Sequence, residues 1–398
     1  MTEVTGTNEQ PPTPAPIGVP FRIAQCASVW RIDLNSPIFI IPLISLDPVY
    51  PFATPPATGA TQVVAPGVHW LRMPLPFALD HINLYVIEDG DGLTIVDTGY
   101  ALDNVKAGWR TVLAQLAKPV KKIVVTHFHP DHLGLAAWLE DETGAPVLMT
   151  MGEYLTAQMI WHQVPSFDAA GMVRFFRRHG LPEEACMALE KRGNAYQKGV
   201  PALPCHYQRL VAHQTLPIDG RDWQVIIGRG HAVEHAALYC ADAGLLLSGD
   251  MLLPRITSNV TAFAQSPDDD TLTHYLDSVG AFASLPDETL VLPAHGLPFS
   301  NIKGRIAAIR QHHQERLAVL EAACDTPKTA AELLPVLFGR SDFDPHQNMF
   351  AMGEAIAHLN HLRHATRLTV SSSSTTGQLS FTRAIPVTSA TTATARPL

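Results

Sequence analysis

The chain has 398 residues, of which 46% are hydrophobic and 16% are charged, and this balance supports a sizeable core and excludes a wholly disordered protein. Aspartate and glutamate (37) outnumber lysine and arginine (28), and the resulting net charge of −9 disfavours a protein whose main partner is nucleic acid. The longest continuous apolar run near the N-terminus, Ile38–Ile41, is far shorter than the ~18 residues of a membrane helix.

Five cysteines are scattered along the chain, and no two of them form a CxxC pair. This usage is typical of reduced thiols and disfavours both a disulfide scaffold and a thiolate zinc site. The first residues lack the basic stretch and the following apolar stretch of a secretory signal. We therefore expect a cytoplasmic protein that does not bind a membrane.

Both ends of the chain lack the signals of regular structure. Residues 1–60 are rich in proline, which interrupts helices and strands, and they are predicted to form a flexible extension. The apolar stretch Ile38–Leu46 could either pack on the rest of the protein or stay exposed. Residues 385–398 are rich in Ser, Thr and Ala and are predicted to form a disordered tail.

Residues 61–300 alternate β-rich runs with helical spacing and form the first predicted domain. The expected strands are 63–64, 68–73, 83–88, 93–97, 121–126, 146–149, 223–227, 237–240, 245–248 and 289–292. The expected helices are 102–116, a helix after residue 131, 154–162, 169–179 and 183–192. This order predicts an α/β domain of the α+β type, with sheets packed between helix layers. The helices within about residues 150–210 are expected to form a cap over the pocket.

Residues 301–384 form a second predicted domain with a different pattern. Helical spacing covers residues 302–323, 329–337 and 348–364. Two short strands, 368–370 and 378–382, flank a Ser/Thr-rich turn and predict a hairpin. Three helices followed by a hairpin indicate a small winged-helix-like domain. The histidines at 358, 361 and 364 are expected to lie at the surface or at a domain contact, because no carboxylate cluster accompanies them.

The strongest signal for chemistry is the motif His-Phe-His-Pro-Asp-His, directly after a strand of Ile and Val. Its candidate metal ligands are His127, His129, Asp131 and His132. Imidazole and carboxylate bind divalent transition metals, and four such groups on one tight loop can face a common point. The first two histidines point the same way on extended backbone, whereas the last two residues lie where a helix begins and can face a second ion. A surface His-rich loop is the alternative, which the position after a strand disfavours.

Three further polar residues, His231, Asp250 and His295, each follow an apolar run. Taken singly, each would more often be an ordinary core or loop residue. Active sites of layered α/β folds gather at strand ends, however, so these residues match what the histidine motif would need. Together with that motif they predict one metal site.

The order and spacing of these residues resemble the metallo-β-lactamase-fold hydrolases, in the branch similar to glyoxalase II. The resemblance runs from about Gly67 to Phe299. It is carried by Val96-Asp97-Thr98-Gly99, the HxHxDH motif, Gly230-His231, Gly249-Asp250 and Ala294-His295-Gly296. It implies a four-layer αββα sandwich with a site for two divalent metal ions, zinc first, with iron or manganese as alternatives.

The family's pattern also implies how the ligands are shared. His127, His129 and His231 would hold one ion, and Asp131, His132 and His295 the other. Asp250 would bridge the two ions. This bridging residue argues against antibiotic hydrolysis as the main role, and the full second set argues against a single-iron persulfide dioxygenase. The C-terminal helices resemble the extension of endoribonuclease-like members, but few clustered Lys or Arg residues support a nucleic-acid role there.

The ligand set indicates a mechanism in which a metal-bound hydroxide attacks the substrate. We expect Asp131 to orient the hydroxide and accept its proton. Asp97 is a candidate partner for the outer N–H of a ligand histidine, or else a turn residue before Thr98-Gly99.

Candidates for substrate contacts are weaker, and each has a structural alternative. Three aromatic residues could line an apolar pocket or pack in the core. Two arginines on one helix face could hold an anionic tail of the substrate or be solvated. Three further residues follow Asp250 closely enough to reach the site. These candidates are Tyr100, Tyr154, Trp161, Arg174, Arg177, Arg255, Ser258 and Asn259.

These observations predict a metal-dependent hydrolase that cleaves a carboxylic thioester, ester or lactone of a small acyl substrate. The alternative is a phosphodiesterase or endoribonuclease acting on single-stranded RNA, because the same two metal ions could catalyse that cleavage. A binding module with an idle metal site is a third class, which the complete ligand set disfavours. A homodimer is possible on general grounds, since dimers are the commonest assembly.

Overall fold

The computed structural model describes residues 46–385, so the Ile38–Leu46 stretch and the C-terminal tail lie almost entirely outside the described residues. The described chain begins before the predicted boundary at residue 61. Val49 and Ser300 exchange backbone hydrogen bonds of 3.1 and 2.9 Å, which attach residues 46–60 to the first domain. No helix among residues 46–385 combines the length and apolar character needed to span a membrane.

The first sheet has seven strands in the order β1-β2-β3-β4-β5-β6-β7. Their bounds are β1 (Thr61–Ala65), β2 (Val68–Pro74), β3 (His81–Asp89), β4 (Gly92–Val96), β5 (Val120–Val124), β6 (Val147–Thr150) and β7 (Gln208–Leu210). The pairs from β1 to β4 are antiparallel, and those from β4 to β7 are parallel. Every residue of β4 and β6 is buried, as expected for parallel strands covered on both faces.

The second sheet has five strands in the order β12-β11-β10-β9-β8. Their bounds are β8 (Thr215–Ile218), β9 (Arg221–Gly228), β10 (His235–Cys240), β11 (Leu245–Gly249) and β12 (Leu290–Pro293). Only β11 and β12 run parallel; the other pairs are antiparallel. The ends of β11 and β12 therefore meet at one edge, where both predicted ligands Asp250 and His295 follow.

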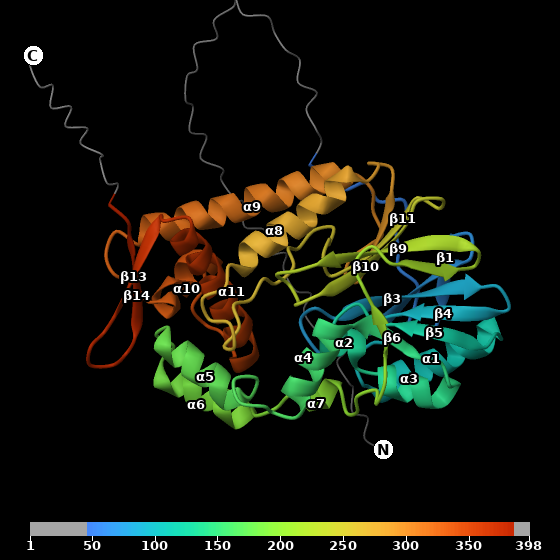
Figure 1. The fold of residues 1–398 in the computed structure, drawn as a ribbon, viewed down its shortest axis with the longest axis horizontal. Coiled ribbons are helices and arrows are strands. Elements are labelled where there is room, and N and C mark those ends of the chain that lie inside the picture. Colours follow the sequence, from blue (N-terminus) through green and yellow to red (C-terminus); the bar gives the residue numbers. More distant parts are fainter. Residues whose placement is uncertain (1–45, 386–398) are drawn as a thin grey trace, which may run out of the picture. The chain divides into compact units, whose positions relative to one another are not determined.

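The two sheets pack face to face between two layers of helices, as Figure 1 shows. The helices α1 (Asp103–Leu116) and α3 (Ala136–Thr143) cover the first sheet, and α8 (Thr271–Ala281) and α9 (Ile302–Ala323) cover the second. Large side chains such as Trp70, Trp223 and Leu238 fill the space between the sheets. The predicted αββα sandwich is confirmed.

The helices between β6 and β9 divide into two groups. They are α4 (Met151–Trp161), α5 (Ala169–Arg178), α6 (Glu183–Arg192) and α7 (Tyr196–Gly199). The short α7 contacts α4 and α2 (Pro130–Leu133), close to the histidine motif, and Tyr196 donates a hydrogen bond of 2.6 Å to the carbonyl of Phe128. In contrast, α5 packs on α6, and α6 packs on α11 (Pro345–His364), so these two helices extend the C-terminal domain.

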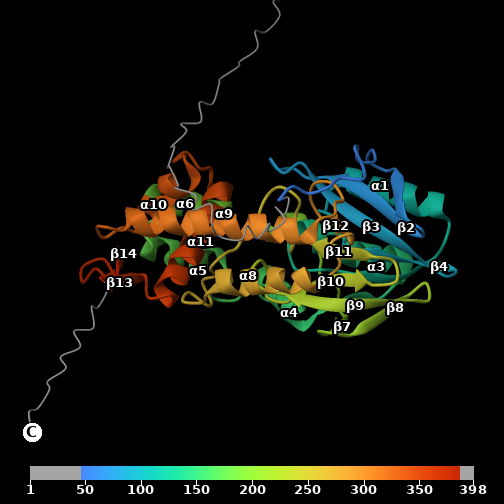
Figure 2. The same ribbon diagram turned by 90° about the horizontal axis from the view of Figure 1, so that it is seen from above.

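The C-terminal region consists of three helices and a hairpin, as predicted. Its elements are α9, α10 (Ala330–Phe338), α11, β13 (Leu368–Ser372) and β14 (Leu379–Arg383). Both α10 and α11 begin with a capping box, formed by Thr329 with Glu332 and by Asp344 with Gln347. In Figure 2, α9 lies beside α8 and continues to α10, so one helix belongs to both domains. The winged-helix designation stays a prediction.

Two of the three histidines of α11 contact the segment before α8, as expected, whereas the prediction of a surface or domain-contact position is wrong for His358, which is buried within the C-terminal helices. His358 is buried against His313 of α9, with a ring nitrogen distance of 3.1 Å. His361 contacts Asp270 at 3.1 Å, and His364 contacts the carbonyl of Asp268 at 2.7 Å.

The core between the sheets gives a direct test of the packing. Trp223 is fully buried there, so Trp223→Ala should lower the free energy of unfolding by about 3–5 kcal/mol through lost burial and a cavity. Val319→Ala removes a side chain that is 48% exposed on α9, so it should change the free energy of unfolding by less than about 0.5 kcal/mol. Chemical denaturation measures both, and equal effects would contradict this packing.

Candidate metal centre

The candidate ligands come from four strand ends that converge at one edge of the sandwich. The histidine motif follows β5, His231 follows β9, Asp250 follows β11 and His295 follows β12. These ends place seven imidazole and carboxylate groups in two adjacent sets. The first set is His127, His129, His231 and Asp250, and the second is Asp131, His132 and His295. Within each set, the facing ligand atoms lie within 4.8 Å of one another.

In the first set, three ring nitrogens and one carboxylate oxygen face each other. The Nε2 atom of His127 lies 2.9 Å from Nδ1 of His129 and 3.2 Å from Nε2 of His231. The Nε2 atom of His231 also lies 3.3 Å from Oδ2 of Asp250. This grouping matches the predicted ligands of one ion together with the bridging residue.

In the second set, the carboxylate of Asp131 faces two imidazoles. Its Oδ2 atom lies 3.4 Å from Nε2 of His295 and 3.8 Å from Nε2 of His132. The other carboxylate oxygen of Asp250, Oδ1, lies 3.4 and 3.5 Å from the same two ring nitrogens. Asp250 therefore turns one oxygen to each set, which is the position that a bridging ligand requires.

Two observations show that this donor set fits metal ions. The buried atoms His132 Nε2 and Asp250 Oδ1 have no hydrogen-bond partner within residues 46–385, although buried polar groups are normally paired. In addition, ring nitrogens of His127, His129 and His231 face each other at hydrogen-bond distance, so some lone pairs must meet. Cations between these atoms would satisfy both conditions, and a donor set of nitrogen and oxygen suits zinc, iron or manganese.

The outer nitrogens of three histidines are each held by a fixed acceptor. His132 donates its Nδ1–H to Oδ2 of Asp97 at 2.7 Å. His231 and His295 donate theirs to the backbone carbonyls of Asn259 and His81, each at 2.8 Å. Such contacts orient the ring and leave Nε2 free to face a metal ion.

Asp97 is a buried residue in a strained conformation. Its φ angle of 60° is rare for a residue other than glycine, and such strain often marks functional sites. Thr126 donates its backbone N–H to Oδ1 at 2.8 Å and its hydroxyl to Oδ2 at 2.9 Å. The predicted contact between Asp97 and a candidate ligand histidine is thus observed, and the same carboxylate fixes the start of the histidine motif.

Burial and charge set the protonation states of the site, and these states differ between its groups. Burial lowers the pKa of His295, but the carboxylates of Asp250 and Asp131 outweigh this effect and raise it to about 10, so a metal ion bound there would displace a proton. Burial lowers the pKa of His129 to about 3, so its imidazole is neutral and offers a lone pair. Burial alone would raise the pKa of Asp131, but the neighbouring His132 and His295 hold it at about 2. Asp131 is therefore a carboxylate at neutral pH.

The structure adds two residues that the sequence patterns did not identify. Glu153 accepts hydrogen bonds from the backbone N–H groups of Phe128, at 2.9 Å, and Glu234, at 2.5 Å, and burial raises its pKa to about 7. His235 accepts a hydrogen bond of 3.2 Å from the backbone N–H of Asp250. Both residues hold the backbone of ligand-bearing segments. A glutamate in a helix and a histidine in a strand give no signal by themselves.

Two of the predicted substrate contacts instead support the ligands. Ser258 donates a short hydrogen bond to the carbonyl of Asp250, and Asn259 accepts from His231 through its own carbonyl. Both therefore position ligand residues.

Four other candidates make contacts that involve none of the seven ligand residues. Tyr154 donates to the carbonyls of Pro204 and Cys205 and stacks on Tyr207, and Trp161 donates to the carbonyl of Val200. Arg177 pairs with Glu183 and Glu190, and Arg174 of the same helix is exposed, which agrees with the solvated alternative.

Tyr100 and Arg255 remain near the centre. Tyr100 interacts electrostatically with Asp131 and with Arg192, an arginine that the sequence did not single out, and burial raises the pKa of the Tyr100 phenol. Arg255 lines a cavity of about 300 Å³ that reaches the ligand His295. The cavity is lined by Tyr50, Leu79, His81, Pro254, Arg255, Ile256, His295, Gly296 and Leu297.

The contact between Asp97 and His132 leads to a specific prediction. Asparagine tolerates the positive φ and keeps an acceptor for Thr126, so Asp97→Asn removes mainly the charge beside His132. Metal affinity should fall about 10–100-fold, measured by competition with a chelator. Asp141→Asn, an exposed change in α3, should leave the affinity unchanged. Equal affinity in the two variants would contradict the role of this contact.

Comparisons with known proteins agree with the site. The family model described as "Metallo-beta-lactamase superfamily" matches residues 78–295, and that described as "Metallo-beta-lactamase-like, C-terminal domain" matches residues 317–384. A solved structure of a beta-lactamase domain protein from Burkholderia ambifaria is 41% identical, with a TM-score of 0.76, and covers 85% of this chain and 97% of its own.

Two curated relatives are similar over long stretches. A probable metallo-hydrolase, YqjP of Bacillus subtilis, is 28% identical over 75% of this chain and 93% of its own length. A hydroxyacylglutathione hydrolase of Albidiferax ferrireducens is 30% identical over 58% of this chain and 68% of its own length. With the first family model spanning more than half of the sequence, the chain belongs to the metallo-beta-lactamase superfamily.

Proposed function

We propose that this protein is a dinuclear metal-dependent hydrolase that cleaves a carboxylic thioester, ester or lactone. The observation that carries the proposal is the position of Asp250, whose two oxygens face two complete sets of candidate ligands. The similarity to a hydroxyacylglutathione hydrolase, whose name describes an acyl thioester substrate, supports the thioester class.

We propose that His127, His129 and His231 hold one ion, that Asp131, His132 and His295 hold the other, and that Asp250 bridges them. Two divalent ions, zinc first, would polarise the scissile carbonyl and lower the pKa of a bound water toward ~7.

The remaining steps belong to the protein's own side chains. The carboxylate of Asp131 lies among the candidate ligands, where it would orient the attacking water and accept its proton. Asp97 holds His132 in one tautomer and orientation throughout the reaction. Tyr100 and Arg255 are the proposed substrate contacts, because both lie next to the ligand residues.

The first test is thiol release from a panel of acyl-CoA and acyl-glutathione thioesters with metal-loaded protein. The wild-type protein should turn over at least one member. Asp250→Ala should lose more activity than the ~10–100-fold that is typical when a residue hydrogen-bonded to a metal ligand is replaced. Asp277→Ala removes an exposed carboxylate of α8 and should retain activity. An inactive wild-type protein across thioesters, esters and lactones would refute the proposal.

A second test concerns the need for both ions. His129→Ala removes one ligand of the first set, so metal content and turnover should fall together. Metal analysis of the purified variant beside its turnover number measures both. Full activity with one ion missing would refute a mechanism that uses two metals.

A further inference from the structure

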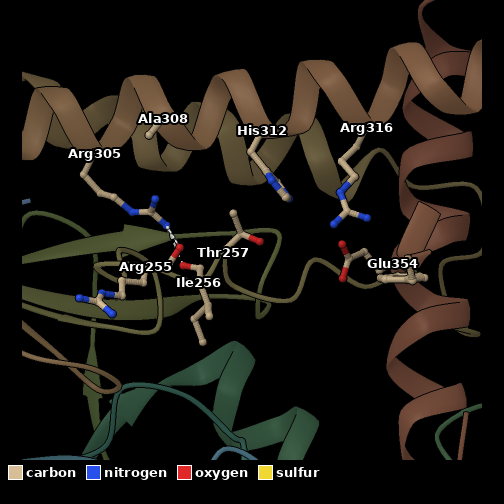
Figure 3. Close-up of a pocket in the computed structure, with 9 residues that line it drawn as sticks. Arg255, Ile256, Thr257, Arg305, Ala308, His312, Arg316 and Glu354 are labelled. Carbon is tan, nitrogen blue, oxygen red and sulfur yellow. Dashed lines mark hydrogen bonds between the residues drawn. The ribbon is translucent and has the colours of Figure 1, made fainter. Parts of the chain in front are cut away.

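A second and larger cavity, of about 460 Å³, lies where the first domain meets the C-terminal helices. Figure 3 shows its lining residues, which come from the segment after Asp250, from α9, from α10 and from α11. They are Arg255, Ile256, Thr257, Arg305, Ala308, His312, Arg316, Phe338 and Glu354. Three arginines and one glutamate are among these residues.

Arg305 builds one wall of this cavity. It donates from Nε to the carbonyl of Leu253 at 2.6 Å, and from Nη2 to the carbonyls of Arg255, at 3.2 Å, and Ile256, at 2.7 Å. Three backbone acceptors therefore fix the segment that carries Arg255. The side chain of Arg305 is buried, so it adds positive charge to the wall while its Nε and Nη2 atoms bind the backbone.

Arg316 has a donor without a partner among residues 46–385. Its Nη1 atom is buried and has no hydrogen-bond partner in the described part of the chain. In Figure 3, the side chains of Arg316 and Glu354 point toward each other across the cavity from α9 and α11. A buried guanidinium N–H without an acceptor is unfavourable, so Arg316 keeps an unsatisfied donor beside the cavity.

The charge balance of the cavity favours an anion with more than one charge. Burial raises the pKa of Glu354 to about 7, so near neutral pH this carboxyl group offsets only part of the positive charge. Arg255 is exposed, and its guanidinium lies over the ring of Tyr50, 5.7 Å from the ring centroid. Several guanidinium groups against one partly protonated carboxyl suit a phosphate ester better than a single carboxylate.

The position of the cavity connects it with the metal centre. It shares Arg255 and Ile256 with the smaller cavity that reaches His295. A long molecule with its acyl group at the ligand residues could therefore pass Arg255 and place its far end beside Arg316. The guanidinium of Arg255 lies over Tyr50, which lines the smaller cavity.

We propose that the larger cavity binds the phosphate-bearing end of the substrate's thiol portion, with Arg316 and Arg255 as its ligands. This inference rests on the proposed thioester hydrolysis and narrows it to phosphorylated thiols. A free phosphate compound that binds in the same place without being part of the substrate is the competing source of this chemistry.

Binding and turnover are measured separately. Calorimetry with inorganic pyrophosphate should show binding to the wild-type protein and a loss of about tenfold in Arg316→Gln. Arg310→Gln changes the same charge on the exposed side of α9 and is the matched control. Absence of binding to the wild-type protein, or equal binding by the two variants, would overturn the anion site. Thermal unfolding confirms that both variants are folded.

Turnover then distinguishes a substrate tail from a free anion. Acetyl-CoA and S-acetylpantetheine carry the same thioester, but only the first carries phosphates. Arg316→Gln should raise KM about tenfold for acetyl-CoA and leave KM for S-acetylpantetheine within about twofold, with kcat unchanged for both. Equal KM effects, or none, would overturn the assignment to a substrate tail even if pyrophosphate binds. Hydrolysis of neither thioester would refute the thioester proposal and this assignment with it, while the calorimetry would still decide whether the cavity binds anions.

Discussion

The gathering of seven imidazole and carboxylate groups in two adjacent sets, five of them buried and two half-buried, is the constraint on which the rest of the site depends. A buried polar atom without a partner costs about 1–3 kcal/mol, and His132 Nε2 and Asp250 Oδ1 are two such atoms. The fold reduces this cost by pairing the far side of the same groups. Asp97, the carbonyl of Asn259 and the carbonyl of His81 each accept from one ligand histidine. The atoms that stay unpaired in the described chain, His132 Nε2 and Asp250 Oδ1, lie among the seven candidate ligands, where cations would supply the missing partners.

The backbone around the site adopts conformations that few residues tolerate. Gly249, which directly precedes Asp250, has a φ of 51°, and a Cβ atom there would collide with the ring of His235. Gly230, which directly precedes His231, has a φ of 95°, and a Cβ atom there would collide with the backbone of Thr271 and Tyr275. These glycines let two ligand-bearing segments approach their neighbours closely, which explains why each precedes a ligand.

The sequence predicted the ligands because short-range patterns carry them. A strand of Ile and Val followed by HxHxDH, and single polar residues after apolar runs, need no knowledge of distant contacts. No short-range pattern marks the supporting residues. The hydrogen bonds between Glu153 and Glu234 and between His235 and Asp250 form only after the sheets have packed. Ser258 and Asn259 contact Asp250 and His231, and these contacts could not be derived from their proximity in sequence.

In the fold, too, features with a local sequence pattern were predictable and features that depend on distant contacts were not. The helix 302–323 and the hairpin were predictable from their own periodicity, whereas β7, β8 and α8 were not identified. The strands β7 and β8 have three and four residues, too few to show a period, and their place in the sheets comes from pairing with β6 and β9. The α5–α6 pair has clear helical spacing, but its packing on α11 could not be derived from spacing alone.

The segment from Asp250 to Asn259 shows why the C-terminal helices belong to the site. It supplies Asp250 to the centre, and through Asn259 it holds His231. Arg305 of α9 fixes its middle through three carbonyls, and Glu354 of α11 accepts a hydrogen bond of 3.2 Å from the Asn259 side chain. A shift of either helix would therefore move a backbone carbonyl that orients a candidate ligand. The second domain thus sets the geometry of the metal centre although it supplies none of the seven candidate ligands.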